Sequence, residues 1–440
     1  MLFSALLAAT ALLAQTSEAR LLSRDSNITV TVSKPAPFKA PSTVQTTDNV
    51  LTLTKKSSTG SKARSAARLL GLDIAPGNST GLISLFVGEE FATNITFGTE
   101  TLEVIVDTGS SDTWLVETGF SCVDVNTGAS ETEAYCAFGP TYDVTSGFSE
   151  IAGEEFSITY GDGEYLDGVV GYQEVTLAGI TVNQTVALVN YAAWYGDSTT
   201  SGLVGLAYPA LTSAYSSKTG SQIVYNPIFT TMYEAGLVDP LFSLIIERDV
   251  SGPAGYLALG GVPPVNFTQN FTSTPILITS ISGYPVTYDF YTIEVDDIVL
   301  DGAAVSGSGG TTQYIVDSGT TLNYFPTAVA DAVNAAFSPA AVYSDYEGAY
   351  VVDCNAVAPS LGIQIGGTIF YTNPLDMILL AGTDSSGNDI CISGIDDGGS
   401  AGNLFILGDT FQKNVVTVFD VGAVELKFAS REFYDSNDTY

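Results

Sequence analysis

Residues 104–114 read VIVDTGSSDTW, and a near copy, YIVDSGTTL, returns at residues 314–322. In each copy an apolar run rich in β-branched residues leads to an aspartate at a turn, Asp107 in the first and Asp317 in the second. The glycine that follows can take a positive φ, and the small hydroxyl side chains beside it can donate hydrogen bonds to a carboxylate. Each half of the chain therefore offers one oriented carboxyl group.

A second pair of matching segments follows the first pair at a similar distance. GLVGL occupies residues 202–206, and LFILGD occupies residues 404–409. A single Asp-Thr-Gly or Asp-Ser-Gly is typical of an ordinary β-turn, because Asp and Gly favour turns. Two copies in matched surroundings instead predict that a whole lobe is repeated.

With these motifs the sequence resembles the pepsin-like aspartic proteases, and in particular their secreted, fungal-type members, from about Phe91 to Ala429. The resemblance implies a mainly β, bilobal fold whose lobes are related by a pseudo-two-fold axis and enclose a cleft. It also implies an aspartic endopeptidase that is made as a secreted zymogen and cuts peptide bonds at acid pH.

The resemblance assigns the site residues as well. Asp107 and Asp317 are the catalytic pair, YGDG at residues 160–163 matches the flap, and LVG (203–205) and ILG (406–408) match the elements beneath the aspartates. The implied substrate-binding residues are Tyr160, Gly161, Asp162, Gly109, Gly319 and Thr320, and the supporting residues are Thr108, Ser110, Ser318 and Trp114. Ser318 stands where many members have threonine, but it keeps the hydroxyl.

Two carboxyl groups held close together cannot both ionise easily, so the pair is expected to share a proton. The ionised member can take a proton from an attacking water molecule while the protonated member donates to the peptide carbonyl. A hairpin carrying Tyr160 would close over the substrate and exclude water. Because clefts of this family are apolar, we expect large apolar residues around the cut, while Asp162 either meets a substrate lysine or stabilises its turn.

Two other functions remain open from the sequence. The bilobal scaffold could bind without cleaving, although both aspartates and the flap tyrosine are present. A glycosidase would also use two carboxylates, but the placement of the acids in repeated turns favours the protease. Casein and chitin assays at acid pH separate the three.

The composition predicts two domains and a mainly β chain. The 440 residues are 45% hydrophobic and only 14% charged, which suffices for more than one core. Many short runs rich in Gly, Thr, Val and Tyr favour strands, with helices expected after Asn226-Pro227, ending near Gly236, and from Thr327 to before Pro339. We place the N-terminal lobe at residues 72–250 and the C-terminal lobe at 251–440.

The first 19 residues read as a secretory signal peptide, with an apolar run and small residues before a cut after Ala19. The alternative, a membrane anchor, needs about 20 apolar residues. We therefore expect a secreted, extracellular protein, with a vacuolar or cell-wall location also open.

The leader, residues 20–71, carries nine of the fourteen basic residues: Arg20, Arg24, Lys34, Lys39, Lys55, Lys56, Lys62, Arg64 and Arg68. It could be a flexible linker, whereas the resemblance implies a removable prosegment whose basic side chains pair with active-site carboxylates. The net charge of −34 is therefore unevenly distributed: the leader is basic, and the rest of the chain from Leu72, the acidic body, is far more acidic. Such a body repels nucleic acids and anionic membranes and suits acid conditions. The resemblance implies protein and peptide substrates, and we expect a monomer with no membrane span.

Four cysteines, Cys122, Cys136, Cys354 and Cys391, allow three pairings, and we expect one local disulfide in each lobe. The chain has no histidine and no Cys-x-x-Cys, so we expect no metal and no cofactor, and Ser-His-Asp and Cys-His mechanisms are excluded. Seven asparagines precede x-Ser/Thr and could be glycosylated: Asn27, Asn78, Asn94, Asn183, Asn266, Asn270 and Asn437.

Overall fold

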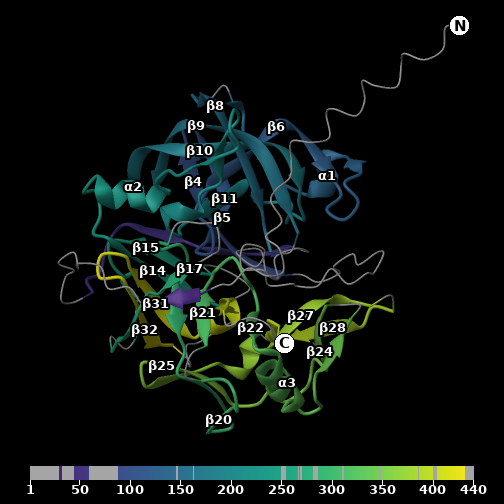
Figure 1. Cartoon of the computed structure of the whole chain (residues 1–440). Helices are drawn as coiled ribbons and strands as arrows, with labels where there is room; N and C mark the ends of the chain where they lie inside the picture. Colours follow the sequence, from purple (N-terminus) through teal and green to yellow (C-terminus); the bar gives the residue numbers. More distant parts are fainter. Residues whose placement is uncertain are drawn as a thin grey trace, which may run out of the picture.

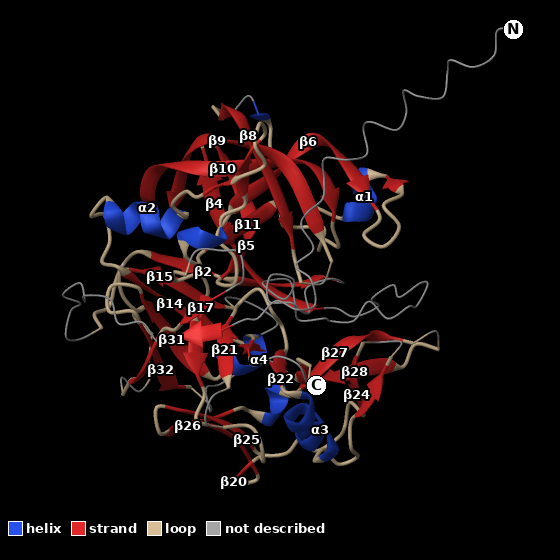
Figure 2. Ribbon diagram, in the orientation of Figure 1, coloured by secondary structure: helices blue, strands red, loops and turns tan. Residues whose placement is uncertain are grey.

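The computed structural model describes residues 29–31, 44–58, 88–144, 147–161, 163–248, 254–265, 267, 270–280, 286–309, 312–345, 348–384, 386–399 and 404–431. Within these residues strands predominate and the helices are short, which confirms the mainly β prediction (Figure 2). The predicted signal peptide and the predicted lobe boundary at residue 250 lie outside the described residues. No described helix is long and apolar enough to cross a membrane.

The N-terminal lobe, blue to teal in Figure 1, is built on an 11-stranded sheet in the order β13-β12-β8-β9-β10-β6-β11-β5-β4-β3, with β7 beside β6. Its strands are β3 (Thr54–Ser58), β4 (Gly88–Phe97), β5 (Glu100–Asp107), β6 (Thr113–Val123), β7 (Ser130–Glu131), β8 (Ser149–Thr159), β9 (Tyr165–Leu177), β10 (Ile180–Ala193), β11 (Gly202–Gly205), β12 (Ala214–Ser216) and β13 (Gln222–Ile223). The helical elements here are α1 (Glu133–Cys136), the 3-10 turn η3 (Pro209–Leu211) and α2 (Ile228–Glu234).

The C-terminal lobe, green to yellow in Figure 1, contains three smaller sheets. The first joins β18 (Thr292–Glu294), β21 (Gln313–Val316), β30 (Leu404–Leu407), β22 (Asn323–Phe325) and β29 (Ile395–Asp397). The second joins β20 (Ala303–Ala304), β19 (Asp297–Leu300), β25 (Leu361–Ile365) and β26 (Thr368–Tyr371), and the third joins β23 (Val342–Ser344), β24 (Ala349–Val352), β28 (Asp389–Ser393) and β27 (Ile378–Thr383). The helical elements are α3 (Thr327–Ala335), η4 (Pro374–Asp376) and α4 (Asp409–Gln412).

A six-stranded sheet connects the two lobes and also takes in the leader. Its order is β16 (Thr272–Pro275), β32 (Glu425–Ser430), β31 (Val415–Asp420), β14 (Leu241–Ile246), β15 (Gly255–Leu259) and β2 (Val50–Thr52). The leader strands β2 and β3 thus enter two different sheets, because β2 pairs with β15 and β3 pairs with β4. A further short pair is formed by β1 (Thr29–Thr31) and β17 (Ile278–Ser280).

The repeat seen in the sequence is a repeat of strand pairing. In the first lobe β11 runs parallel to β5, with Gly205 opposite Asp107, and antiparallel to β6. In the second lobe β30 runs parallel to β21, with Leu407 opposite Val316, and antiparallel to β22. Both aspartate turns therefore sit on the same arrangement of three strands.

The two predicted helices are present as α2 and α3. Helix α2 begins one residue later than expected, because Pro227 takes the N-cap position in place of Asn226. It ends before Gly236, whose φ is 71°. Helix α3 begins at Thr327 as predicted and buries Val329 and Val333 against the core.

Candidate active site

Both aspartates lie where a buried β-strand reaches a turn, and each turn supplies the same two donors. Gly109 N donates to Asp107 Oδ1 at 2.7 Å, and the Ser110 hydroxyl donates to Asp107 Oδ2. Gly319 N donates to Asp317 Oδ1 at 2.9 Å, and the Thr320 hydroxyl donates to Asp317 Oδ2 at 2.5 Å. Each turn therefore orients its carboxyl group by one amide and one hydroxyl, as the repeat predicts.

The two turns are fastened to each other by Thr108 and Ser318. Thr108 N donates to Ser318 Oγ at 3.1 Å, and Ser318 N donates to Thr108 Oγ1 at 2.9 Å. Each hydroxyl in turn donates to a strand carbonyl of the opposite lobe, at Val316 and Val106. Serine at position 318 thus makes the reciprocal contact in full, since the contact needs only a hydroxyl.

Glycines allow the close approach of the segments around the turns. A Cβ atom at Gly319 would lie 2.5 Å from Asp107 Oδ1. A Cβ atom at Gly205 would lie 2.6 Å from the Ser111 backbone, and one at Gly408 would lie 2.3 Å from the Leu322 and Thr320 carbonyl oxygens. Because a side chain would collide with backbone or with the dyad, these three positions require glycine.

The electrostatics of the pair follow from burial and proximity. Both aspartates are fully buried. Burial raises the pKa of Asp317 well above its usual range, and the neighbouring charge of Asp107 raises it further, against the hydrogen bonds from Thr320 and Gly319. One proton is therefore retained by the pair at pH values where an exposed aspartate has lost its own.

The predicted flap is the hairpin of β8 and β9, with Tyr160 directly after β8. Gly163 N donates back to the Tyr160 carbonyl at 3.1 Å, and Gly163 has a φ of 96°, which closes a tight tip. The indole N–H of Trp114 donates to the Tyr160 hydroxyl at 2.8 Å. Gly161 lies at this tip, and Asp162 lies outside the described residues.

Several residues near the site had no role in the sequence-based prediction. The ring of Trp194 packs edge-on against the ring of Trp114, with 5.1 Å between the ring centroids, and its centroid lies 5.7 Å from that of Tyr160. An aromatic cluster therefore surrounds Tyr160. Asp409, directly after the Ile-Leu-Gly segment, is fully buried, and neither carboxyl oxygen has a hydrogen-bond partner among the described residues. Burial raises the pKa of Asp409 well above its ordinary value, in spite of the Lys413 charge.

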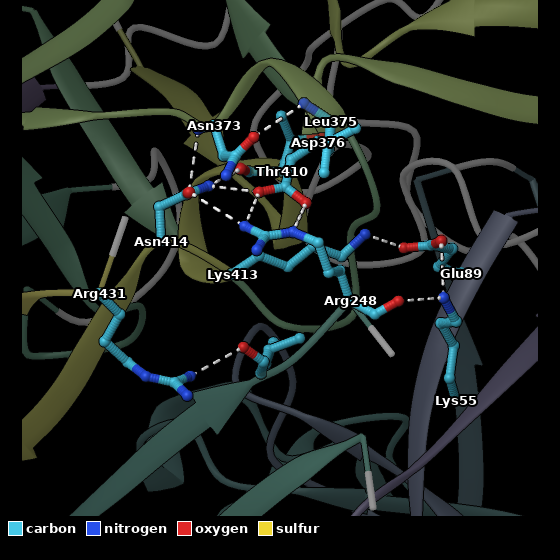
Figure 3. Close-up of polar contacts among 11 residues, drawn as sticks. Lys55, Glu89, Arg248, Asn373, Leu375, Asp376, Thr410, Lys413, Asn414 and Arg431 are labelled. Atoms are coloured by element: carbon cyan, nitrogen blue, oxygen red, sulfur yellow. Dashed lines mark hydrogen bonds and ion pairs between the residues drawn. The ribbon is translucent and has the colours of Figure 1, made fainter. Parts of the chain in front are cut away.

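A cluster of ion pairs joins the leader, β4, η4 and the residue that follows α4 (Figure 3). Glu89 on β4 pairs with Lys413 and, at 3.6 Å, with Lys55 of the leader. Burial opposes ionisation of Glu89, but the charges of Lys413 and Lys55 outweigh it and lower the pKa of Glu89. Beside them Arg248 forms a bidentate pair with Asp376, at 2.9 and 2.7 Å.

Both expected disulfides are present. Cys122 is bonded to Cys136 and Cys354 to Cys391, which gives one local bridge to each lobe. The first bridge ties β6, which carries Trp114, to α1.

Paired carboxyl groups on two mutually fastened turns define the class of aspartic peptidases, and comparison with known proteins agrees. The family described as eukaryotic aspartyl protease matches residues 90–431. A probable aspartic-type endopeptidase of Aspergillus fumigatus is 53% identical over 412 residues, covering 93% of each chain. Pepsin A of Sus scrofa is 31% identical, covering 76% of this chain and 80% of pepsin, and secreted aspartic protease 8 of Candida albicans is 28% identical, covering 80% and 78%.

The chain belongs to the eukaryotic aspartyl protease family. It is an aspartic-type endopeptidase, a hydrolase that acts on protein substrates, and it has the bilobal, mainly β fold of that family.

Proposed function

We propose that Asp107 and Asp317 are the catalytic pair and that they hydrolyse peptide bonds with one shared proton. The ionised carboxylate takes a proton from a water molecule as that water attacks the peptide carbonyl, and the protonated carboxyl donates to the carbonyl oxygen. The carboxyl group that took the water's proton then gives it to the leaving nitrogen as the carbon–nitrogen bond breaks, and the hydroxyl formed at the carbonyl oxygen returns its proton to the other carboxylate. The observation that carries this proposal is the matched set of donors to the two buried carboxyl groups, with the raised pKa of Asp317.

The working range is acidic on this proposal, because the shared proton has to be present. Tyr160 closes over the bound peptide from the flap, and large apolar residues are preferred on both sides of the cut. Such side chains each gain about 1.5 to 3 kcal/mol on burial.

The leader is proposed to be a removable prosegment. It is seated by strand pairing in two sheets and by ion pairs of Lys55 with Glu89 and Lys56 with Glu103, the latter at 2.8 Å. These partners lie on β4 and β5; the other basic residues of the leader lie outside the described residues. Since the pKa of Glu89 is lowered, its ion pairs contribute stability at neutral pH and lose it as the pH falls through that pKa.

Secretion is proposed from the signal-peptide pattern, the two disulfides and the likeness to a relative named as secreted. Disulfides form and persist on that route.

The test replaces each aspartate in turn, as Asp107→Asn and Asp317→Asn. The amide keeps the shape of the carboxyl group but cannot carry the shared proton, so cleavage of an apolar peptide at acid pH is expected to fall below a few per cent with normal folding. Pepstatin is expected to inhibit the unmodified enzyme. Substantial residual cleavage by either folded variant, free of wild-type protein, would show that the pair is misassigned.

A further inference from the structure

The flap strand β8 has a neighbour on its outer edge that the sequence did not reveal. The hairpin of β12 and β13 pairs along β8, with Ala214 opposite Phe156 and Ser216 opposite Glu154. Ser157 N also donates to the carbonyl of Ser213, at 3.1 Å. The position of β8, and of Tyr160 at its end, therefore depends on where this hairpin is held.

Both ends of the hairpin are fastened to one buried carboxyl group, that of Asp112. Ser213 N donates to Asp112 Oδ1 at 2.9 Å, and the hydroxyl of Tyr225 donates to the same oxygen at 2.5 Å. The side chain of Asp112 is fully buried, and its other oxygen, Oδ2, has no hydrogen-bond partner among the described residues. A buried carboxyl group that serves only two donors from one hairpin is costly to maintain, which points to a role.

Asp112 is also part of the first catalytic loop. Five residues after Asp107, its backbone carbonyl accepts a hydrogen bond from Gly205 N at 2.8 Å, beneath the dyad. Two residues after Asp112 lies Trp114, whose indole N–H donates to the Tyr160 hydroxyl. The loop that orients Asp107 and the hairpin that supports the flap are thus joined through one side chain.

Tyr225 contacts both this carboxyl group and the buried cluster to which Tyr160 belongs. Its ring packs against the buried cluster that contains Trp114, Tyr160 and Trp194. Burial and the adjacent Asp112 carboxyl raise the pKa of Tyr225 well above its ordinary value, and Tyr160 adds to the shift, so the phenol keeps its proton and remains the donor.

We propose that Asp112 and Tyr225 are positioning residues that hold the flap over the dyad. They fix the β12–β13 hairpin, and through it β8 and Tyr160. The proposal rests on the flap role of Tyr160 given above. Losing the Tyr225 hydroxyl lowers the fraction of enzyme whose flap is ready to close, which weakens substrate binding by that factor.

The central variant is Tyr225→Phe, measured in the enzyme secreted from the full chain and brought to acid pH, with an apolar chromogenic peptide. We expect KM to rise about tenfold, the equivalent of about 1.4 kcal/mol, while kcat changes less than twofold. The matched control is Tyr350→Phe, which removes a tyrosine hydroxyl that donates to Asp331 at 2.6 Å in the other lobe. That variant is expected to leave KM unchanged.

Two replacements of Asp112 separate positioning from bulk stability. Asp112→Asn keeps an oxygen that accepts from Ser213 and Tyr225, so its KM is expected to stay near wild type at acid pH. Asp112→Leu has a similar size but no acceptor and is expected to match Tyr225→Phe or exceed it. If the leucine variant does not fold, the asparagine and phenylalanine variants still decide the matter.

Fluorescence supplies a readout that a purely structural role does not move. The chain has only two tryptophans, Trp114 and Trp194, and both lie in the cluster around Tyr160. Acrylamide is expected to quench them more in Tyr225→Phe than in wild type or Tyr350→Phe, and bound pepstatin is expected to abolish the difference.

An unchanged KM and unchanged quenching in folded Tyr225→Phe would overturn the proposal, as would a loss in Asp112→Asn as large as in Asp112→Leu. Tyr160→Phe distinguishes the two levels of the argument. If Tyr160→Phe raises KM and Tyr225→Phe does not, the flap role of Tyr160 stands and the positioning role of Asp112 and Tyr225 is wrong. If neither variant raises KM, both roles are wrong.

Discussion

Replacing Asp112 by asparagine is expected to change how the stability of the protein depends on pH. Burial raises the pKa of Asp112 from 3.8 to about 6, against the hydrogen bonds from Ser213 and Tyr225. Between these two values the unfolded chain has lost the proton while the folded chain keeps it. The free energy of unfolding therefore falls as the pH rises through this window. Above about pH 7 Asp112 is ionised in both states, so it causes no further change with pH.

The magnitude follows from the size of the shift. A difference of about two pKa units, at 1.36 kcal/mol per unit, gives about 3 kcal/mol of stability lost between pH 3 and pH 7. Asp112→Asn removes this loss. The amide nitrogen adds a cost of its own inside the lobe, but that cost is the same at both pH values and cancels from the difference.

The assay is urea unfolding at pH 3 and pH 7, followed by tryptophan fluorescence, with Asp107→Asn in every protein to prevent self-digestion. From pH 3 to pH 7, the Asp112 variant is expected to lose about 3 kcal/mol less than its parent. Asp384→Asn is the control with the opposite sign, because hydrogen bonds from Asn388 lower the pKa of that exposed carboxyl group. Equal losses in the Asp112 variant and its parent would show that folding does not raise the pKa of this carboxyl group, which contradicts the prediction.

Three more predictions concern other parts of the chain. Asp376→Asn is expected to destabilise the protein by about 3 to 5 kcal/mol in urea unfolding, because it leaves Arg248 buried without the Asp376 charge. The double variant Arg248→Met with Asp376→Leu is expected to recover much of the loss, and equal destabilisation by the single and double variants would contradict this. Lys55→Gln is expected to raise the pH at which the leader is lost, as followed by N-terminal sequencing, and an unchanged pH would show that its ion pair with Glu89 does not retain the leader. Asp162→Thr is expected to lower the ratio of kcat/KM for peptides with Lys rather than Leu before the cut; an unchanged ratio leaves that aspartate with a turn role only.

The catalytic turns could be predicted from the sequence because everything they need is local. A β-branched run, an aspartate, a glycine and a hydroxyl residue occur within seven positions, and the second copy removes the ambiguity of the first. The reciprocal bonds of Thr108 and Ser318 cross between the copies, yet the repeat itself places them.

The pairing of the leader could not be predicted in the same way. Strand β2 has three residues, and its partner β15 lies about 200 positions later, with Val50 opposite Ala258. Nothing in so short a segment specifies a partner that distant, because strand pairing is decided by which edges the rest of the fold leaves open. The contact of Asp112 could not be predicted for the same reason. Asp112 lies within residues 104–114, but its partner Tyr225 lies 113 residues further on.

Acidification acts in opposite directions on two parts of this molecule. Asp112 and Asp317 are buried carboxyl groups with raised pKa values, so the folded lobes are relieved of an electrostatic cost as the pH falls. Glu89 has a lowered pKa, so its ion pairs with Lys55 and Lys413 weaken as the pH falls below 4.5, the ordinary value of a glutamate. On the proposal that the leader leaves at acid pH while the lobes stay folded, both signs are needed together, and we infer that the acidic body and the basic leader are matched for this purpose.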